Sequence, residues 1–413
     1  MKCYRLIGSL LYSLLLIFST LSCSQHVRIG AEILLEKHLS LLQGKNVGII
    51  CNHTSLLPDG TDLVDALLSK GVTITALFAP EHGIRGIVSA GEHVTDSVDA
   101  KTGIRIFSLY GKNRKPTPDM LKNVDVLLFD LQDVGARFYT YASTMAYVMQ
   151  AAAENYKKII VLDRPNPIGG IDIDGPVLDT TLKSFLGMFP IPIRHGLTLG
   201  ELAKMIVGER WMNNVSNLDL TVITMEGWKR EMYYDETGLP WIPPSPNMKT
   251  LLTAIVYPGT CLFEATNVSE GRGTPYPFQY IGAPWMNGKV LSEKLNALHL
   301  QGVEFLPQQF TPIADSVSGS DPKYKGKSCQ GVNVTITGRA EFHPVLTAIA
   351  ILQSIAELYP DSLQIKTPNF EMLSGSKQLR GSLKNAALLK TFTSERESLL
   401  VQFKQVRIKY LLY

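Results

Sequence analysis

Short, nearly continuous runs of Val, Ile and Leu alternate with helix-like segments in the first half of the chain, and this alternation constrains the fold most strongly. The apolar runs lie at residues 47–51, 72–78, 104–109, 124–129, 158–162 and 218–225. Segments with helical spacing lie at 61–69, 142–154 and 198–208. Apolar strands that alternate with helices are typical of a parallel sheet covered on both faces. We therefore predict a doubly wound α/β domain.

The rest of the chain predicts a second, smaller domain. A length of 413 residues is enough for about two domains. Residues 240–258 are rich in proline, and the apolar runs after them are shorter, apart from a helix-like run at 345–358. We predict one domain over residues 26–257 and another over residues 258–413.

The first 22 residues have the pattern of a secretory signal. Lys2 and Arg5 precede an apolar run at residues 6–18, and small residues then lead to Cys23. The ending resembles a bacterial lipoprotein signal, so we predict that Cys23 is lipidated. The protein would then lie in the cell envelope, periplasmic or bound to the outer membrane through a lipid anchor only. The alternative is ordinary cleavage into the periplasm. A permanent membrane helix is disfavoured because the run is shorter than the roughly 20 residues needed to span.

The composition and the absent motifs exclude several classes of partner. The formal charge is only +3, and Lys and Arg are scattered, so nucleic acid is not expected as a partner. Cys51, Cys261 and Cys329 are widely spaced, which indicates neither disulfides nor a metal site. Nucleotide, phosphate-loop, nucleophile-elbow and zinc-protease fingerprints are missing. His82 and His93 each follow a glutamate, but hydrogen-bonded loop histidines explain them better than a metal does. We predict that no cofactor and no metal is needed.

Polar side chains gather where the predicted strands end. Ligands of parallel sheets bind outside the carboxyl ends of the strands, so residues far apart in sequence should converge there. These residues are Asn52 and His53; Glu81, His82 and Arg85; Asp130, Asp133 and Arg137; Asp163, Arg164 and Asn166; and Arg194 and His195. Two structural alternatives stay open: Glu81 could simply pair with Arg85, and residues 163–167 could be a proline-stiffened loop in which Asp163 pairs with Arg164.

A second cluster lies just past the predicted domain boundary. Residues 263–274 contain Glu264, Asn267, Glu270 and Arg272, with glycine on both sides of Arg272 and aromatic residues following. Domain junctions are favoured places for ligand clefts. The pattern therefore favours a binding loop over a solvated surface turn.

The chain resembles the exo-β-N-acetylmuramidases of the NamZ family. The motifs that carry the resemblance lie at residues 80–86, 129–141, 163–167, 244–247 and 264–274. The resemblance implies a Rossmann-like N-terminal domain without a nucleotide, a smaller α+β C-terminal domain and a cleft between them. The implied activity is hydrolysis of N-acetylmuramic acid from the non-reducing end of peptidoglycan fragments.

That activity gives roles to the polar clusters. Glycoside hydrolysis ordinarily uses two carboxyl groups, and an arginine can hold the lactyl carboxylate of muramic acid bidentately. We predict Glu81 as the general acid and Glu270 as the second carboxyl, because flanking glycines would let its loop approach the sugar. Asp130 and Asp133 compete for that second role, and Glu264 could instead brace the loop. The substrate-binding candidates are His82, Arg85, Arg137, Tyr139, Arg164, Asn166, Glu264, Asn267 and Arg272, with Arg272 as a clamp.

Two other functions stay open at this stage. One is an esterase or amidase of wall fragments that uses the same cleft. The other is a non-catalytic sugar-binding lipoprotein, which would not need an essential carboxyl group.

Overall fold

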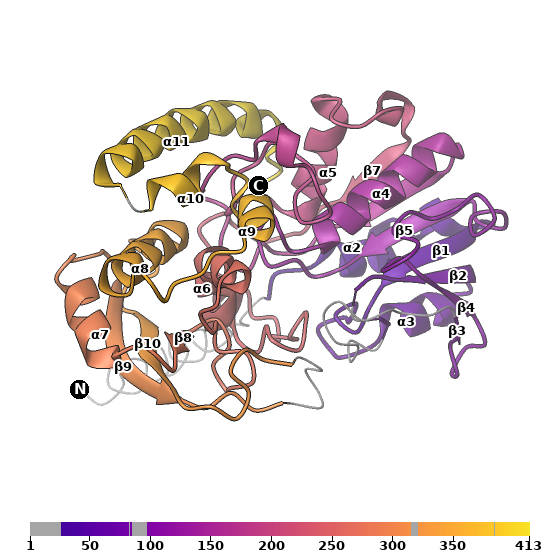
Figure 1. Ribbon diagram of the computed structural model, residues 1–413. Helices are drawn as coiled ribbons and strands as arrows, with labels where there is room; N and C mark the ends of the chain where they lie inside the picture. The colour runs from indigo at the N-terminus through magenta and orange to yellow at the C-terminus, as the bar shows by residue number, and fades with distance from the viewer. Residues whose placement is uncertain (1–25, 82, 85–96, 315–320, 384) are drawn as a thin grey trace, which may run out of the picture.

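A seven-stranded sheet organises the N-terminal part of the molecule (Figure 1). The computed structural model describes residues 26–81, 83–84, 97–314, 321–383 and 385–413. The sheet order is β3-β4-β2-β1-β5-β6-β7, and all neighbouring strands are parallel except β3 and β4. The strands are β1 (Asn46–Cys51), β2 (Thr73–Ala79), β3 (Ser97–Val98), β4 (Arg105–Ser108), β5 (Val126–Asp130), β6 (Lys158–Leu162) and β7 (Leu220–Ile223).

Helices cover both faces of this sheet, as the apolar strands predicted. Successive residues of a strand point to opposite faces. Accordingly Leu128 of β5 packs with helices α2 (Gly30–Lys37) and α3 (Leu63–Ser69), whereas Leu127 packs with α4 (Tyr141–Glu154) and α5 (Leu199–Gly208). The predicted doubly wound α/β class is confirmed.

The strand order fixes where a ligand site can form. Numbered in chain order, the six parallel strands lie 3-2-1-4-5-6, the Rossmann arrangement. The order reverses between β1 and β5. A crevice therefore opens outside the carboxyl ends of these two strands, beside Asn52 and Asp130.

The C-terminal part is a smaller α+β unit built on an antiparallel sheet, β8-β10-β9. Its strands are β8 (Tyr280–Ala283), β9 (Val303–Phe310) and β10 (Cys329–Ile336). Helix α7 (Gly288–Asn296) packs on β9 and β10, and α8 (Pro344–Leu358) packs on α6 (Leu251–Thr260). Helix α6 crosses the predicted boundary at residue 257 and belongs with the C-terminal unit through α8. Helices α9 (Thr367–Ser374), α10 (Gln378–Ser382) and α11 (Ala386–Arg407) complete it.

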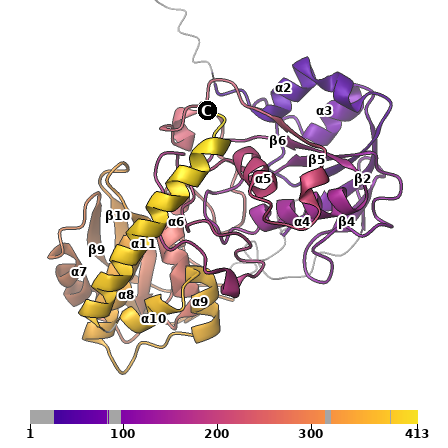
Figure 2. The same ribbon diagram turned by 90° about the horizontal axis from the view of Figure 1, so that it is seen from above.

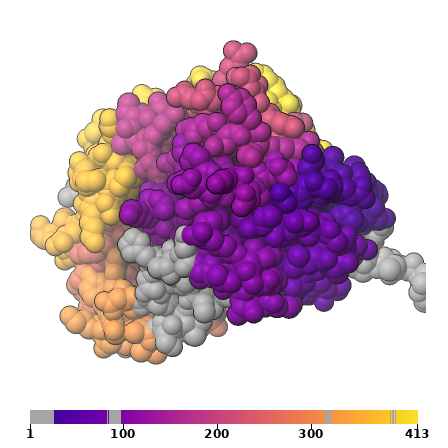
Figure 3. Space-filling view, turned by 90° about the vertical axis from the view of Figure 1, so that its right-hand side faces the viewer, coloured from indigo at the N-terminus to yellow at the C-terminus, as the bar shows by residue number. Residues whose placement is uncertain are grey.

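Helix α11 returns the chain to the N-terminal domain (Figure 2). It runs from beside α10 toward α5, and Arg407 at its end donates hydrogen bonds to the carbonyl oxygens of Gly170 and Ile171. Seen from the side in Figure 3, the two domains adjoin as one mass. Among the residues described, no helix combines the length and the apolar character needed to cross a membrane.

Arg137 is a second link between the domains. Its buried guanidinium donates to the carbonyl oxygens of Pro176 and Ile191 in the N-terminal domain, at 2.7 and 2.8 Å. It also donates to those of Leu373 and Ser374 in α9, at 3.0 and 2.8 Å. Burial lowers the pKa of Arg137 to about 9, which still leaves it charged at neutral pH. This cation therefore joins two domains through backbone oxygens.

Asp163 connects strand β6 with α5 and the last residue of the chain. Its buried carboxylate accepts hydrogen bonds from the Thr198 hydroxyl (2.7 Å), the Gly200 backbone N–H (2.8 Å) and the Tyr413 hydroxyl (2.8 Å). Burial outweighs these donors and raises the pKa of Asp163 from 3.8 to about 7.

Replacing Arg137 by Met should lower the free energy of unfolding by at least about 3 kcal/mol, because buried carbonyl groups lose their donor. Urea denaturation followed by fluorescence measures this. The matched control is Arg339→Met, which breaks an exposed pair with Asp235 and should cost less than about 1 kcal/mol. Equal losses of unfolding free energy in the two variants would contradict the role of Arg137 as a link between the domains.

Asp163 should make the protein less stable as the pH rises from about 4 to 7. In this range the folded chain keeps a proton that the unfolded chain has lost, so the stabilisation present below pH 3.8 disappears by about pH 7. The effect is at most about 4 kcal/mol. Asp163→Asn should flatten this part of the curve of unfolding free energy against pH, whereas Asp361→Asn at the surface should not. Parallel curves for Asp163→Asn and the unmutated protein would refute it.

Candidate active site

The carboxyl edge of the sheet carries a cavity whose wall comes from both domains. Its volume is about 120 Å³. Glu81 follows strand β2, Tyr141 begins α4, and Phe138, Tyr139 and Thr140 directly precede that helix. Leu186 is a further wall residue from the N-terminal domain. The rest of the wall comes from the proline-rich loop and the C-terminal domain: Ser245, Pro246, Asn247, Met248, Tyr257, Glu264, Arg272 and Phe278. The two predicted clusters thus meet at Glu81, Glu264 and Arg272.

Glu81 is positioned by the first turn of helix α4. The hydroxyl of Thr140 donates to one of its carboxylate oxygens, Oε2, at 2.7 Å. Thr140 precedes the helix, so the carboxylate also lies at the positive end of the helix dipole. Glu81 is half-buried, as expected for a group that follows a buried strand.

Glu264 is the second carboxylate at the cavity wall. It accepts a hydrogen bond from Nη2 of Arg272 at 2.6 Å, and its side chain is 31% exposed. Arg272 lies over the ring of Phe278, with 5.1 Å between the guanidinium carbon and the ring centre. Burial lowers the pKa of Arg272, but the charges of Glu264 and Glu270 outweigh burial and raise it above its usual value.

Glu270 lies behind this wall, which reverses the predicted preference for Glu270 over Glu264. Its side chain is only 4% exposed and accepts from Nζ of Lys323 at 2.8 Å, with Nε of Arg272 at 3.4 Å. Lys323 also donates to the carbonyl oxygens of Phe263 and Val268. These contacts make Glu270 the residue that braces the loop.

The glycines of this loop serve protein packing. Gly271 and Gly273 both have positive φ, at 78° and 76°. A side chain on Gly271 would meet the carbonyl oxygens of Tyr276 and Tyr280, and one on Gly273 would meet that of Ile313. The glycines therefore let the loop fold onto neighbouring backbone, which differs from the predicted approach to a sugar.

Asp133 lies apart from this cavity. It lines an enclosed void of about 10 Å³ together with Arg164 and Asn166. Its carboxylate accepts from the Gly135 N–H at 2.8 Å, and Nε2 of His195 lies 3.8 Å away. Burial raises the pKa of Asp133 to about 7 and lowers that of His195 to about 3. This buried pair sits beneath the site and does not form its wall.

Four predicted substrate-binding side chains have structural partners instead. Arg137 tethers the domains, and Arg164 holds Asp130 bidentately at 2.6 and 2.8 Å. Asn166 bonds to the backbone of Leu197 and Ile168. Asn267 bonds to the backbone of Ser362 and Gln364. These geometries argue against direct substrate contact, because each of the four side chains is already held by hydrogen bonds to the protein. Asp163 and Arg164 do not pair with one another through their side chains.

His82 and Arg85 lie outside the described residues. Tyr139 lies at the cavity wall as predicted, and its ring packs edge-on against Tyr141 with 4.9 Å between centres. The described residues include no group of three or more His, Cys, Asp or Glu side chains that could hold a metal ion. Independence of metals and cofactors stays a prediction.

Sequence reasoning missed Thr140, Ser245 and Asn247 as wall residues. Ser245 and Asn247 belong to the motif at residues 244–247, which carries the family resemblance but has no predicted role. Three prolines within five positions, Pro243, Pro244 and Pro246, were the available signal. Such a loop holds its remaining polar side chains in fixed positions.

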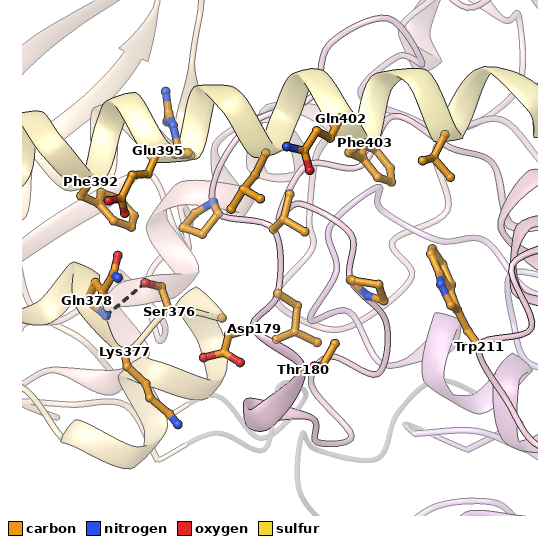
Figure 4. A pocket seen from close by; sticks show the side chains of 18 of the residues that line it. Asp179, Thr180, Trp211, Ser376, Lys377, Gln378, Phe392, Glu395, Gln402 and Phe403 are labelled. Carbon is orange, nitrogen blue, oxygen red and sulfur yellow. Dashed lines mark hydrogen bonds between the residues drawn. The ribbon is translucent and has the colours of Figure 1, made fainter.

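A larger cavity lies elsewhere in the described part of the chain. It has a volume of about 730 Å³ and runs under α11, where Phe392 and Phe403 face Trp211 and Thr180 (Figure 4). Helix α5 begins at the carboxyl edge of the sheet, so its final residues, which line this cavity, point to the opposite edge. None of the predicted site residues lies in its wall.

Comparisons with known proteins agree with this architecture. Residues 47–252 match the family model of the exo-β-N-acetylmuramidase NamZ N-terminal domain, and residues 255–413 match that of the C-terminal domain. The peptidoglycan β-N-acetylmuramidase NamZ of Bacillus subtilis (strain 168) is 45% identical over 389 residues, covering 94% of this chain and 91% of the relative.

Two solved structures of DUF1343 family proteins from Bacteroides fragilis NCTC 9343 are also similar. One is 38% identical with a TM-score of 0.86, and the other is 36% identical with a TM-score of 0.77. Each match covers 94% of this chain and 99% of the solved chain. The family models together span most of the chain, and the Bacillus relative is similar over nearly its whole length. The chain belongs to the NamZ family of exo-β-N-acetylmuramidases.

Proposed function

We propose that this chain hydrolyses terminal N-acetylmuramic acid from the non-reducing end of peptidoglycan fragments, in the cavity between its two domains. Family membership supports the reaction class, a peptidoglycan glycosidase. One observation carries the choice of cavity: two carboxylates, Glu81 and Glu264, line the same wall from different domains. Glycoside hydrolysis ordinarily requires such a pair.

The surroundings of the two carboxylates give them different tasks. Thr140 donates to Oε2 of Glu81 and holds this carboxyl group at the cavity wall, where a general acid would pass a proton to the glycosidic oxygen. Glu264 forms an ion pair with Arg272, an arrangement that suits a base or nucleophile. Two carboxyl groups in unlike environments are the usual basis for such a division of roles.

The remaining wall supplies contacts for the sugar. Tyr139, Tyr257 and Phe278 provide aromatic surface, which packs well against sugar rings. Arg272 uses Nη2 and Nε for its two glutamates. Its Nη1 is left for the lactyl carboxylate of muramic acid, which keeps Arg272 in the role of clamp.

Glu81→Gln and Glu264→Gln should each lower kcat by about 10²- to 10⁴-fold, because each removes a group that transfers a proton or attacks the sugar. The assay follows free N-acetylmuramic acid released from a muramic-acid–glucosamine disaccharide. Glu270→Gln is the matched control: it loses its partner Lys323 and some stability but should keep kcat within about tenfold, since Glu270 does not reach the cavity. Normal turnover by Glu264→Gln together with an inactive Glu270→Gln would contradict this assignment and support Glu270 as the second carboxyl.

We further propose that the enzyme is exported and held at a membrane by a lipid on Cys23. The support is the sequence pattern of residues 1–22, and this segment lies outside the described residues. An envelope location would bring the enzyme to peptidoglycan, the polymer named for its Bacillus relative.

The anchor predicts that Cys23→Ser abolishes incorporation of labelled fatty acid and moves the protein from the membrane fraction to the soluble fraction. One acyl-modified cysteine carries the whole attachment in this proposal, so a partial shift is not expected. Ser22→Ala, next to it, should leave labelling intact. Unlabelled protein in the soluble fraction before mutation would favour ordinary cleavage into the periplasm.

A further inference from the structure

The side-chain amide of Asn247 is a polar group at the cavity wall that the protein itself leaves unused. Asn247 is 4% exposed, and its Oδ1 is buried without a hydrogen-bond partner among the described residues. Leaving a buried carbonyl unpaired costs about 1–3 kcal/mol. Native proteins rarely keep such a group without a use for it.

The loop that carries Asn247 is held by neighbouring segments and by a bond within itself. Nε2 of His53 bonds to the carbonyl oxygen of Pro243 at 2.7 Å, and the Tyr141 hydroxyl donates to that of Pro244 at 2.8 Å. Within the loop, Nε1 of Trp241 donates to the carbonyl oxygen of Met248 at 3.3 Å. The amide is therefore fixed before a ligand arrives, and preorganised groups bind more tightly.

The chemistry of the wall leaves one kind of substrate group for this amide. Glu81 and Glu264 suit the glycosidic bond, and Arg272 suits a carboxylate. Asn247 is neutral and offers both an acceptor and donors. Its complement is a secondary amide, which presents one N–H and one carbonyl oxygen.

We infer that Asn247 binds the 2-acetamido group of the terminal sugar and selects for N-acetylated substrates. The inference rests on the proposed function. The Oδ1 of Asn247 accepts the acetamido N–H and thereby loses its unpaired state. A site built to pair with a polar substrate group rejects an analogue that lacks that group, because its own polar atom stays unpaired.

The test uses three aryl β-glycosides: the N-acetylmuraminide, its analogue with a 2-hydroxyl in place of the acetamido group, and the N-acetylglucosaminide, which lacks the lactyl ether. Asn247→Ala should lower kcat/KM by about 10- to 100-fold on both acetamido substrates. On the 2-hydroxy analogue the loss should stay below about threefold, because the lost contact is not made there. Asn247→Asp keeps the shape and an acceptor oxygen, so it should retain the preference for the acetamido group.

Trp241→Phe is the control for a merely structural effect. It removes the hydrogen bond to Met248 and loosens the same loop, so it should lower kcat/KM on all three substrates by one common factor. An equal loss of kcat/KM on all three substrates for Asn247→Ala would overturn the inference. So would a loss confined to the two substrates that carry the lactyl ether, the N-acetylmuraminide and its 2-hydroxy analogue.

The two proposals fail in different ways. An unmutated protein without glycosidase activity would contradict the proposed function. Calorimetric binding of free N-acetylmuramic acid and its 2-hydroxy counterpart would then still test the inference about Asn247. A preference for the acetamido sugar that Asn247→Ala removes supports the inference, and an unchanged preference overturns it.

Discussion

The hydroxyl of Tyr141, a residue of the cavity wall, links the end of strand β1 to the proline-rich loop. It accepts a hydrogen bond from the Asn52 amide at the end of β1 and donates one to the carbonyl oxygen of Pro244, both at 2.8 Å. Burial raises its pKa well above the usual value, so the phenol keeps the proton that it donates. Tyr141 also begins α4, directly after Thr140, which holds Glu81. One buried phenol thus sets the distances between the sheet edge, the acid and the proline-rich loop.

The N-terminal fold could be predicted because burial on both faces leaves a plain mark in the sequence. Strands β5 and β6 are almost wholly apolar, and the segments between them have helical spacing. The C-terminal sheet leaves a weaker mark. In strand β9 only Phe305 and Phe310 are buried, and the strand contains Pro307, so neither a continuous apolar run nor a regular alternation marks it. The two-residue strand β3 is too short for any periodicity.

The site could be predicted only to the level of which loops meet. Parallel topology brings Glu81 to the sheet edge, and the domain junction brings Glu264 and Arg272 to face it. Which glutamate of the second loop faces inward depends on Lys323, which binds Glu270 from 53 residues away. Arg164 looked like a ligand for an anion, but Asp130 already occupies its guanidinium. Local sequence does not encode these distant partners, so residue type alone could not show which side chains they engage.

The arginine tether also has a consequence for how the chain is made. Arg137 and its acceptors in α9 lie 236 and 237 positions apart. Synthesis proceeds from the N-terminus, so the large sheet is complete long before α9 exists. Until then water must solvate half of a cation that ends up buried, and α9 displaces that water when it docks. The part of the chain that matches the N-terminal family model, residues 47–252, therefore completes its packing around Arg137 only when α9 of the C-terminal domain docks.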